Sequence, residues 1–459
     1  MSKVSKILSY VLLLAIFSTC CFTLLSVETP SGADNQNDKM VNDSMIPKSS
    51  GYTITEKWNY TSSGIDDVKI SLDGNYVAIC QNTWNNLTLF HKDSNNTLWN
   101  TDIIPNSINS FDISADGKYI SVGNTGSAYL FNNTEATPAW SKTFMWKFST
   151  ILYAPVQVAI SGDGKYTAWV KGTALYLLDN TLKSSKWFYS GSSVINAADI
   201  GYNPIQNRYY IAIGDQAGNV TLFDDTSNVP LWWNETGNPI NSLKISDDGS
   251  HILAKVGNDK VYFFDNTIEP SKSALWTYPA PNANYRNIDI SADGKNVIIV
   301  EEPKVHYLNS TLTDPKQQEW EALSDNDIIT EGAVSGDGKY ILLGGSIGMI
   351  NPDGVVELYN STNKLPKAPD WKDTKLVPID YVAINGFGNY FAFVEDYYIL
   401  RFYHHDVPLP RAIAASSGGG GDDDDEEAAI PFGNYYLVFA CVAIISLVVT
   451  MKRKVIFKA

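Results

Sequence analysis

A repeated unit occupies most of this chain and limits the folds open to it. Eight related stretches, each with apolar residues on both sides of a short turn, recur at steps of 42 to 50 residues. A nearly constant period in this range, combined with strand-like composition, is typical of β-propeller blades. The central turn residues are Asp73, Asp116, Asp163, Gln206, Asp248, Asp293, Asp337 and Phe387. The units around Gln206 and Phe387 depart most from the common pattern.

The second unit illustrates how one repeat predicts a small sheet. Residues 111–113 alternate apolar and polar side chains, which is typical of a half-buried strand. Asp116 and Gly117 favour a tight hairpin, because glycine accepts a positive φ and aspartate caps nearby amides. Apolar stretches at 119–122 and 128–131 predict the second and third strands. A polar loop follows, and a tryptophan begins the fourth strand.

Tryptophans recur at the spacing of the blades. We expect their rings to fill the wedge between adjacent blades, where burial of a large aromatic side chain contributes most. An exposed tryptophan on a strand edge is the alternative. The positions are Trp58, Trp99, Trp140, Trp187, Trp232 or Trp233, Trp276, Trp320 and Trp371.

The count of strands also predicts how the array closes. The eighth unit ends at residues 398–403 with no tryptophan after it, whereas Trp58 precedes the first turn. We therefore expect the strand around residues 56–61 to complete the last blade, which covers the edges that an open array would expose. The predicted fold class is all-β: a single eight-bladed β-propeller of four-stranded blades, closed by the N-terminal strand, with one C-terminal transmembrane helix.

The units resemble two propeller families. The stretch SADGKYISVG followed by AYLF resembles WD-repeat propellers, and a strand ending in YLF before a loop and a tryptophan is similar to the repeats of pyrroloquinoline-quinone proteins. The resemblance covers about residues 52–408. The chain lacks the Gly-His pair and the Trp-Asp dipeptide of WD repeats, and this region lacks the adjacent cysteines often found at the quinone. The resemblance therefore implies the fold without a function, and no cofactor is predicted.

Net charge and cysteine content restrict the possible partners and the possible sources of stability. The formal net charge of −16 argues against a nucleic-acid partner, since phosphate binding needs clustered lysine and arginine. Cys20 and Cys21 lie near the N-terminus and Cys441 near the C-terminus, which leaves Cys80 alone in the repeat region. An intramolecular disulfide is thereby excluded there. Stability has to come from the core and its closure.

Both ends of the chain carry apolar segments. Lys3 and Lys6 precede an apolar run from Ile7, the order of a signal sequence, with a retained N-terminal anchor as the alternative. Residues 430–451 carry no charge and are long enough to span a bilayer. The basic residues 452–454 behind them place the tail in the cytoplasm. The order resembles the C-terminal sorting or anchoring segments of archaeal surface proteins.

The predicted organisation is a single-pass type I membrane protein with an extracellular propeller. Its parts are a signal segment (1–27), a flexible polar leader (28–50), the propeller ectodomain (51–410), a Gly/Ser and acidic linker (411–429), the transmembrane helix (430–451) and a basic tail (452–459).

Asn-x-Ser/Thr triplets are frequent, and several recur in the loop after the third strand. In an exported protein they are candidate glycosylation sites, with chance in an Asn- and Thr-rich chain as the alternative. The candidates in the ectodomain are Asn59, Asn86, Asn95, Asn132, Asn219, Asn234, Asn309 and Asn360.

The titratable residues form no catalytic or metal-binding pattern in the sequence. His404 and His405 are adjacent in a predicted strand, so they point to opposite faces and make poor joint ligands. The Asp-Gly turns lack the ligand spacing of a calcium loop. No Ser-His-Asp set, phosphate loop or CxxC pair is present. We therefore predict no catalytic residue, metal or cofactor.

The functional expectation is a non-catalytic receptor or scaffold at the cell surface. Its ligand is a protein or a glycan bound to one propeller face through the variable loops. Two alternatives stay open. One is a structural component of the cell envelope that self-associates, and the other is a quinone-dependent dehydrogenase.

Overall fold

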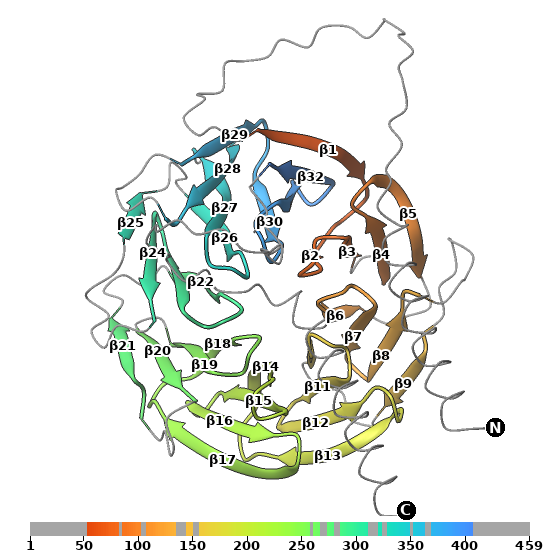
Figure 1. Cartoon of the computed structure of the whole chain (residues 1–459), viewed down its shortest axis with the longest axis vertical. Helices are drawn as coiled ribbons and strands as arrows, with labels where there is room; N and C mark the ends of the chain where they lie inside the picture. The colour runs from red at the N-terminus through yellow and green to blue at the C-terminus, as the bar shows by residue number, and fades with distance from the viewer. Residues whose placement is uncertain are drawn as a thin grey trace, which may run out of the picture. The chain divides into compact units, whose positions relative to one another are not determined.

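A computed structural model describes residues 53–81, 85–101, 107–134, 144–149, 156–257, 260–266, 273–279, 285–310, 320–323, 328–348, 352–362 and 369–406. These residues form 32 strands in eight four-stranded antiparallel sheets, which we call blades 1 to 8 (Figure 1). The predicted eight-bladed propeller with four-stranded blades is confirmed.

Within each blade the strands follow one another from the central axis outward. Blades 1 to 4 comprise β2 Asp67–Ile70, β3 Tyr76–Gln81, β4 Asn86–His91 and β5 Ser94–Thr101; β6 Ile108–Ile113, β7 Tyr119–Asn124, β8 Ser127–Asn132 and β9 Trp146–Ser149; β10 Val156–Ile160, β11 Tyr166–Lys171, β12 Ala174–Asp179 and β13 Ser184–Ser190; and β14 Ile195–Asn203, β15 Arg208–Asp215, β16 Asn219–Asp224 and β17 Ser227–Glu235. Blades 5 to 8 comprise β18 Ile240–Ile245, β19 His251–Val256, β20 Lys260–Asp265 and β21 Trp276–Pro279; β22 Tyr285–Ile290, β23 Asn296–Glu301, β24 Lys304–Asn309 and β25 Trp320–Leu323; β26 Ile328–Val334, β27 Tyr340–Ile347, β28 Asp353–Asn360 and β29 Trp371–Lys375; and β30 Ile379–Ile384, β31 Tyr390–Glu395, β32 Ile399–His405 and β1 Ile54–Thr61.

The last blade contains both ends of the strand array. Its order is β1-β32-β31-β30, and β1 pairs with β32 from Ile54 opposite His405 to Thr61 opposite Ile399. Arg401 on β32 pairs with Glu56 on β1 at 3.1 Å and also with Glu395 on β31. The predicted closure by the N-terminal strand is therefore confirmed.

The ring has two faces with different connections. On one, the turn face, the first strand of each blade turns into the second and the third turns into the fourth. On the other, the loop face, the second strand turns into the third and the chain crosses to the next blade. Backbone hydrogen bonds join neighbouring blades at the turn face, as from Ala115 N to Gly162 O at 2.8 Å. The ring closes with the bond from Gly386 N to Leu72 O at 2.9 Å.

The Ser-x-Asp-Gly motif builds the first turn of six blades. In blade 2 the Ser114 hydroxyl donates to Asp116 Oδ1 at 2.8 Å and accepts from Tyr119 N at 2.9 Å. Asp116 Oδ1 also accepts from Lys118 N at 3.0 Å, while Gly117 adopts a φ of 65°. The same Ser-to-Asp bond is present at Asp73, Asp163, Asp248, Asp293 and Asp337. These aspartates therefore serve to cap the turns, as predicted.

The turn glycines also fix the distance between blades. A Cβ added to Gly117 would lie 2.3 Å from Cδ2 of Tyr76 in the preceding blade. The same approach recurs between Gly164 and Tyr119, at the same distance, so each turn rests on the residue that begins the second strand of its neighbour. Only a residue without a side chain fits there.

Blade 4 breaks this pattern. Gln206 was expected at its turn position, but the bond from Tyr202 N to Asp247 O places Tyr202 where Ala115 stands in blade 2. The capping residue is Asn203, whose Oδ1 accepts from Gln206 N at 2.9 Å. Gln206 lies in the turn at 204–207, as predicted, but it is not the cap, because the hairpin of blade 4 is longer and the cap stands three residues earlier.

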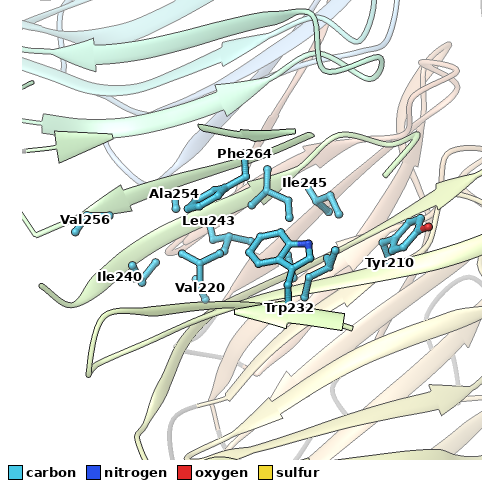
Figure 2. Packing of buried hydrophobic residues seen from close by; sticks show 13 residues of the cluster. Tyr210, Val220, Trp232, Ile240, Leu243, Ile245, Ala254, Val256 and Phe264 are labelled. Atoms are coloured by element: carbon cyan, nitrogen blue, oxygen red, sulfur yellow. The ribbon is translucent and has the colours of Figure 1, made fainter. Parts of the chain in front are cut away.

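Where their side chains are described, the repeated tryptophans lie between blades, as predicted. Trp232 on β17 is buried beside Phe264 on β20 of the next blade, with ring centroids 5.4 Å apart (Figure 2). Trp58, Trp99 and Trp187 contact the corresponding rings of their neighbours. The register places each tryptophan opposite an apolar third-strand residue, in the pairs Leu89–Trp99, Leu130–Trp146, Leu177–Trp187, Leu222–Trp232, Phe263–Trp276, Tyr307–Trp320, Leu358–Trp371 and Phe402–Trp58.

This register corrects the predicted position of the fourth-strand tryptophan in blade 2. In blade 2 the fourth strand begins at Trp146, and not at Trp140, which lies outside the described residues. More residues separate β8 from β9 than separate β4 from β5 in blade 1, so regular spacing does not locate the fourth strand of blade 2.

The strands run from Ile54 to His405, inside the expected limits of 51–410. The predicted signal segment, leader, linker, transmembrane helix and basic tail lie outside the described residues. Among the residues that are described, no helix is long and apolar enough to cross a membrane.

Candidate binding surfaces

The Asn-x-Ser/Thr triplets, or sequons, differ in how exposed their asparagines are. Asn59 on β1 and Asn95 on β5 are exposed, and the Asn95 amide donates to Asn59 O at 3.1 Å. Asn132, by contrast, is only 8% exposed at the end of β8. Since a glycan is attached to an accessible side-chain amide, the exposed Asn59 and Asn95 are the best placed for modification. Five other candidates are half-buried: Asn86, Asn219, Asn234, Asn309 and Asn360.

A turn motif explains why sequons recur after the third strand. Asn132 Oδ1 accepts from both the backbone N and the hydroxyl of Thr134, at 2.9 and 2.8 Å. Asn360 caps Thr362 in the same way. Aspartate takes this role at Asp179 and Asp224. Because aspartate cannot be glycosylated, the repetition reflects capping of the turn and gives no support to glycosylation.

The innermost strands carry a ring of charged side chains around the axis. Asp112 on β6 accepts from Ile160 N of the next blade at 2.9 Å, and Asp199, Asp289 and Glu331 make equivalent bonds one blade onward. Lys69 on β2 pairs with Asp112 at 3.6 Å. These bonds join blades near the axis, and the ring is accordingly a structural element.

Burial shifts the pKa values of this ring. It raises the pKa of Asp199 to about 6 and that of Glu331 to about 8. The pKa of Lys69 is also raised, because Asp112 and other carboxylates outweigh the opposing effect of burial. At neutral pH Glu331 therefore holds a proton for a large part of the time.

The two adjacent histidines have separate neighbours. His404 contacts the Tyr390 ring, whereas buried His405 contacts Tyr340 and bonds through Nδ1 to Gly388 O at 3.1 Å. Their opposite orientations confirm the prediction from strand geometry. Among the described residues, no group of three or more His, Cys, Asp or Glu side chains is arranged to hold a metal ion.

An apolar strip lies on the outer rim of blades 3 and 4. Val229, Leu231 and Trp233 on β17 are 66, 46 and 58% exposed. Because they alternate along one strand, they share its outer face. Phe188 on neighbouring β13 is 55% exposed and its carbonyl accepts from the Asn228 amide at 2.9 Å. We call these four apolar residues the rim strip.

The turn between β31 and β32 is strained and exposes two tyrosines. Asp396 and Tyr397 have φ values of 48° and 60°, a region that usually takes glycine or asparagine. Tyr397 and Tyr398 are 47 and 50% exposed. The Tyr398 N–H donates to Glu395 O at 2.9 Å and closes the turn. Strain of this kind persists only where the surroundings fix it, and it concentrates at functional sites.

Two other segments hold this turn in place. Tyr397 N donates to Asp380 Oδ2 at 2.7 Å, and Asp396 N donates to Pro378 O at 3.0 Å. From the connection into blade 1, Ile65 N donates to Tyr397 O at 2.6 Å. We call the surface formed by residues 62–67, 376–381 and 395–398 the tyrosine patch. It lies on the loop face of blades 8 and 1.

Carboxylates lie close to the tyrosines of this patch and shift their pKa values. Asp380, followed by burial, raises the pKa of the Tyr397 hydroxyl. Burial also raises the pKa of Asp380 to about 6. Leu376, at the rim of the same surface, is 90% exposed. No motif predicted this patch, although Asp396-Tyr397 stands where a two-residue hairpin normally has Asn-Gly.

Comparisons with known proteins identify the fold of this chain and nothing more specific. No family model matches the chain, and no curated protein matches it. Its structure is similar to one described as "Crystal Structure Of The C-Terminal WD40 Domain Of Sif2", with a TM-score of 0.59 and 14% sequence identity over 78% of this chain and 99% of that chain. The fold is that of a WD40-type propeller. The resemblance to WD repeats is thereby confirmed as a likeness of fold, and at this identity it extends no further.

Proposed function

We propose that this protein is a non-catalytic binding scaffold, tethered to a membrane by residues 430–451, that presents a ligand-binding propeller face outside the cell. The ligand is a protein or a glycan. The observation that carries the proposal is the tyrosine patch, where two half-exposed tyrosines stand on a strained turn held by two other segments. Rigid aromatic side chains give large contact area at low entropic cost.

The proposed tether rests on the sequence. Residues 430–451 are uncharged and are followed by basic residues, and an acidic run at 422–427 precedes them. The positive-inside rule then places the propeller on the outer side of the membrane. WD40-type propellers commonly act as platforms for protein partners, and the fold supports that class of function by analogy.

The test is capture of the partner from native membranes with full-length protein. Crosslinking followed by mass spectrometry is compared between the wild type and Tyr397→Gly, which removes the ring and suits the positive φ. Lys183→Gly is the matched control, since Lys183 has a φ of 55° on the turn face. A partner lost only with Tyr397→Gly supports the proposal. Equal recovery with all three proteins would refute the patch as the binding face.

The rim strip favours a second function, lateral association with another copy of this chain. An antiparallel contact centred on Leu231 would set Val229 of each copy against Trp233 of the other, so the strip is self-complementary. Pro230 lacks an N–H, which disfavours strand pairing and leaves side-chain packing as the contact. Light scattering of full-length protein should show oligomers that Trp233→Ser reduces. A monomer at all concentrations would exclude this role.

A further inference from the structure

Two aliphatic side chains project from neighbouring turns of the turn face. Ile205, in the turn between β14 and β15, is 94% exposed, and Leu182, in the turn between β12 and β13, is 74% exposed. Both are more exposed than any residue of the rim strip. We call Leu182 and Ile205 the apolar tips. In blades 2, 3, 6 and 7 the first turn has a lysine after its Asp-Gly pair, at Lys118, Lys165, Lys295 and Lys339.

Hydrogen bonds hold both tips away from the core. Asn203 Oδ1 accepts from the backbone N of Ile205 at 3.1 Å, and Asp179 Oδ1 accepts from the backbone N of Leu182 at 2.9 Å. These caps fix the two turns in shapes that leave the aliphatic side chains in water. Burying that apolar surface against a partner is favourable, and exposed apolar groups of this kind mark protein or membrane contacts.

The turn at residues 163–166 lies between the two tips and joins them into one surface. On the side of Leu182, the Asn180 amide donates to Gly164 O at 2.9 Å. On the side of Ile205, the Tyr209 hydroxyl donates to Asp163. The apolar tips therefore stand on either side of one turn and face the same way.

The charges around the apolar tips do not oppose contact with phosphate headgroups. The turn residues 181–184 and 204–207 contain one lysine and no carboxylate. The carboxylates in the neighbouring turns of blades 3 and 4 are paired with bases or accept backbone hydrogen bonds. The ion pairs are Asp224 with Arg208 at 2.9 Å and Asp225 with Lys186 at 3.3 Å, and the acceptors are Asp163 and Asp179. Repulsion from the net charge of −16 is thereby reduced at this place.

The chain leaves the same face on the opposite side of the ring. His405 N donates to Asn389 O, in the first turn of blade 8, at 2.8 Å, and Asp406 N donates to Thr53 O at 2.9 Å. β32 therefore ends at the turn face, and the residues proposed above as the tether come after it. Blade 4 lies across the ring from blade 8 (Figure 1). A tether holds the blade 8 side of this face near the membrane, and the apolar tips are on the other side.

We propose that Leu182 and Ile205 insert into the surface of the bilayer that carries the tether, so that the turn face lies against the membrane. The inference rests on the tether proposed above. Two separate aliphatic tips suit a fluid lipid surface, which closes around each of them, whereas a protein partner needs a continuous matched interface. The loop face, with the tyrosine patch, then points away from the membrane.

The test determines which face contacts lipid in full-length protein reconstituted into liposomes of phosphatidylcholine and phosphatidylglycerol. Photoreactive benzoylphenylalanine replaces Ile205 in one sample and Leu376 in the other, since Leu376 is 90% exposed on the loop face. After irradiation, mass spectrometry measures the yield of lipid adducts at each position. We expect the yield at position 205 to exceed that at position 376 by about tenfold or more.

A second substitution tests whether the tips insert together. Leu182→Ser should lower the yield of lipid adducts at position 205 by up to about tenfold, because it removes half of the inserted apolar surface. Leu98→Ser is the matched control, since Leu98 is a partly exposed leucine on β5 of blade 1. It should leave the yield unchanged.

Three results would overturn the inference: equal yields at positions 205 and 376, no adducts at 205, or adducts at 205 that contain protein in place of lipid. If Tyr397→Gly still abolishes capture of a partner in these cases, the proposed function stands and only the membrane contact is wrong. A higher yield at 376 would place the tyrosine patch against the bilayer and contradict both proposals. Failure of the protein to enter liposomes would remove the tether on which both rest.

Discussion

The two faces of the ring are built in different ways. On the turn face the same Ser, Asp, Gly and aromatic contacts recur with little change, and each turn touches the neighbouring blade. On the loop face the connections differ from blade to blade, and the turn at Tyr397 adopts a conformation that its residues disfavour. The repeated contacts of the turn face stabilise the ring, and the more variable loop face is the one on which we propose that the ligand binds.

Substitution of a tryptophan packed between blades should have the largest effect on the free energy of unfolding. Trp58→Ala removes a ring packed against Phe90 and Phe402 and an indole bond to Lys92 O at 2.9 Å. We expect it to lower the free energy of unfolding by about 3–5 kcal/mol. Trp233→Ala, which removes a 58% exposed ring, should change it by less than about 0.5 kcal/mol. Urea unfolding compares the two, and similar losses would mean that the wedges do not hold the blades together.

Substitution of a turn glycine that packs closely against the neighbouring blade should have the second largest effect on stability. Gly117→Ala introduces a Cβ 2.3 Å from Tyr76 and should cost about 2–4 kcal/mol. Gly237→Ala is the matched control on the loop face, since Gly237 has a φ of 86° but nothing within 4 Å of its added Cβ. It should cost only the backbone term of about 1–2 kcal/mol. If both variants unfold alike, the contact between blades contributes nothing beyond backbone strain.

The charged ring near the axis predicts a dependence of stability on pH. Burial raises the pKa of Glu331 from 4.5 to about 8, so the folded state binds more protons than the unfolded state between these values. Stability should therefore fall as pH rises through that window. Glu331→Gln keeps the acceptor for Val382 N and should raise the melting temperature at pH 8 by roughly 2–4 °C. No gain at pH 8, or an equal gain at pH 4, would contradict this assignment.

The smallest effect concerns the strained turn, and it should have the opposite sign. Tyr397→Gly relieves a φ of 60° and should stabilise the fold by up to about 1 kcal/mol while abolishing ligand binding. Lys183→Gly should stabilise to a similar extent and leave binding intact. Thermal unfolding measures the first effect and the capture assay the second. A clearly destabilised Tyr397→Gly would show that the tyrosine is needed for the fold itself.

The fold could be read from the sequence because its main determinants are local. Asp116 and Gly117 act within one hairpin, and the count of tryptophans was enough to predict that β1 closes the ring. Errors arose where loop length varies. Regular spacing predicts Trp140 where the sheet has Trp146, and predicts the cap at Gln206 where the structure has Asn203, because insertions change the lengths of these loops.

The candidate site was not predictable for a different reason. The conformation of Tyr397 is imposed by Asp380, close in sequence, and by Ile65, which lies more than three hundred residues away in the chain. Nothing within 395–398 alone indicates those partners. The bonds of Asp112 and Glu331 to the next blade are likewise invisible until the strands are placed around one axis.

The position of β32 inside its sheet has a mechanical consequence. Any tension on the chain beyond residue 406 is applied first to β32, and this strand is flanked by β1 on one side and β31 on the other. A strand at an edge could be peeled from a single neighbour, one hydrogen bond at a time. Here two ladders have to fail before the strand comes free, and the first strand of the described residues, β1, helps to anchor the last, β32.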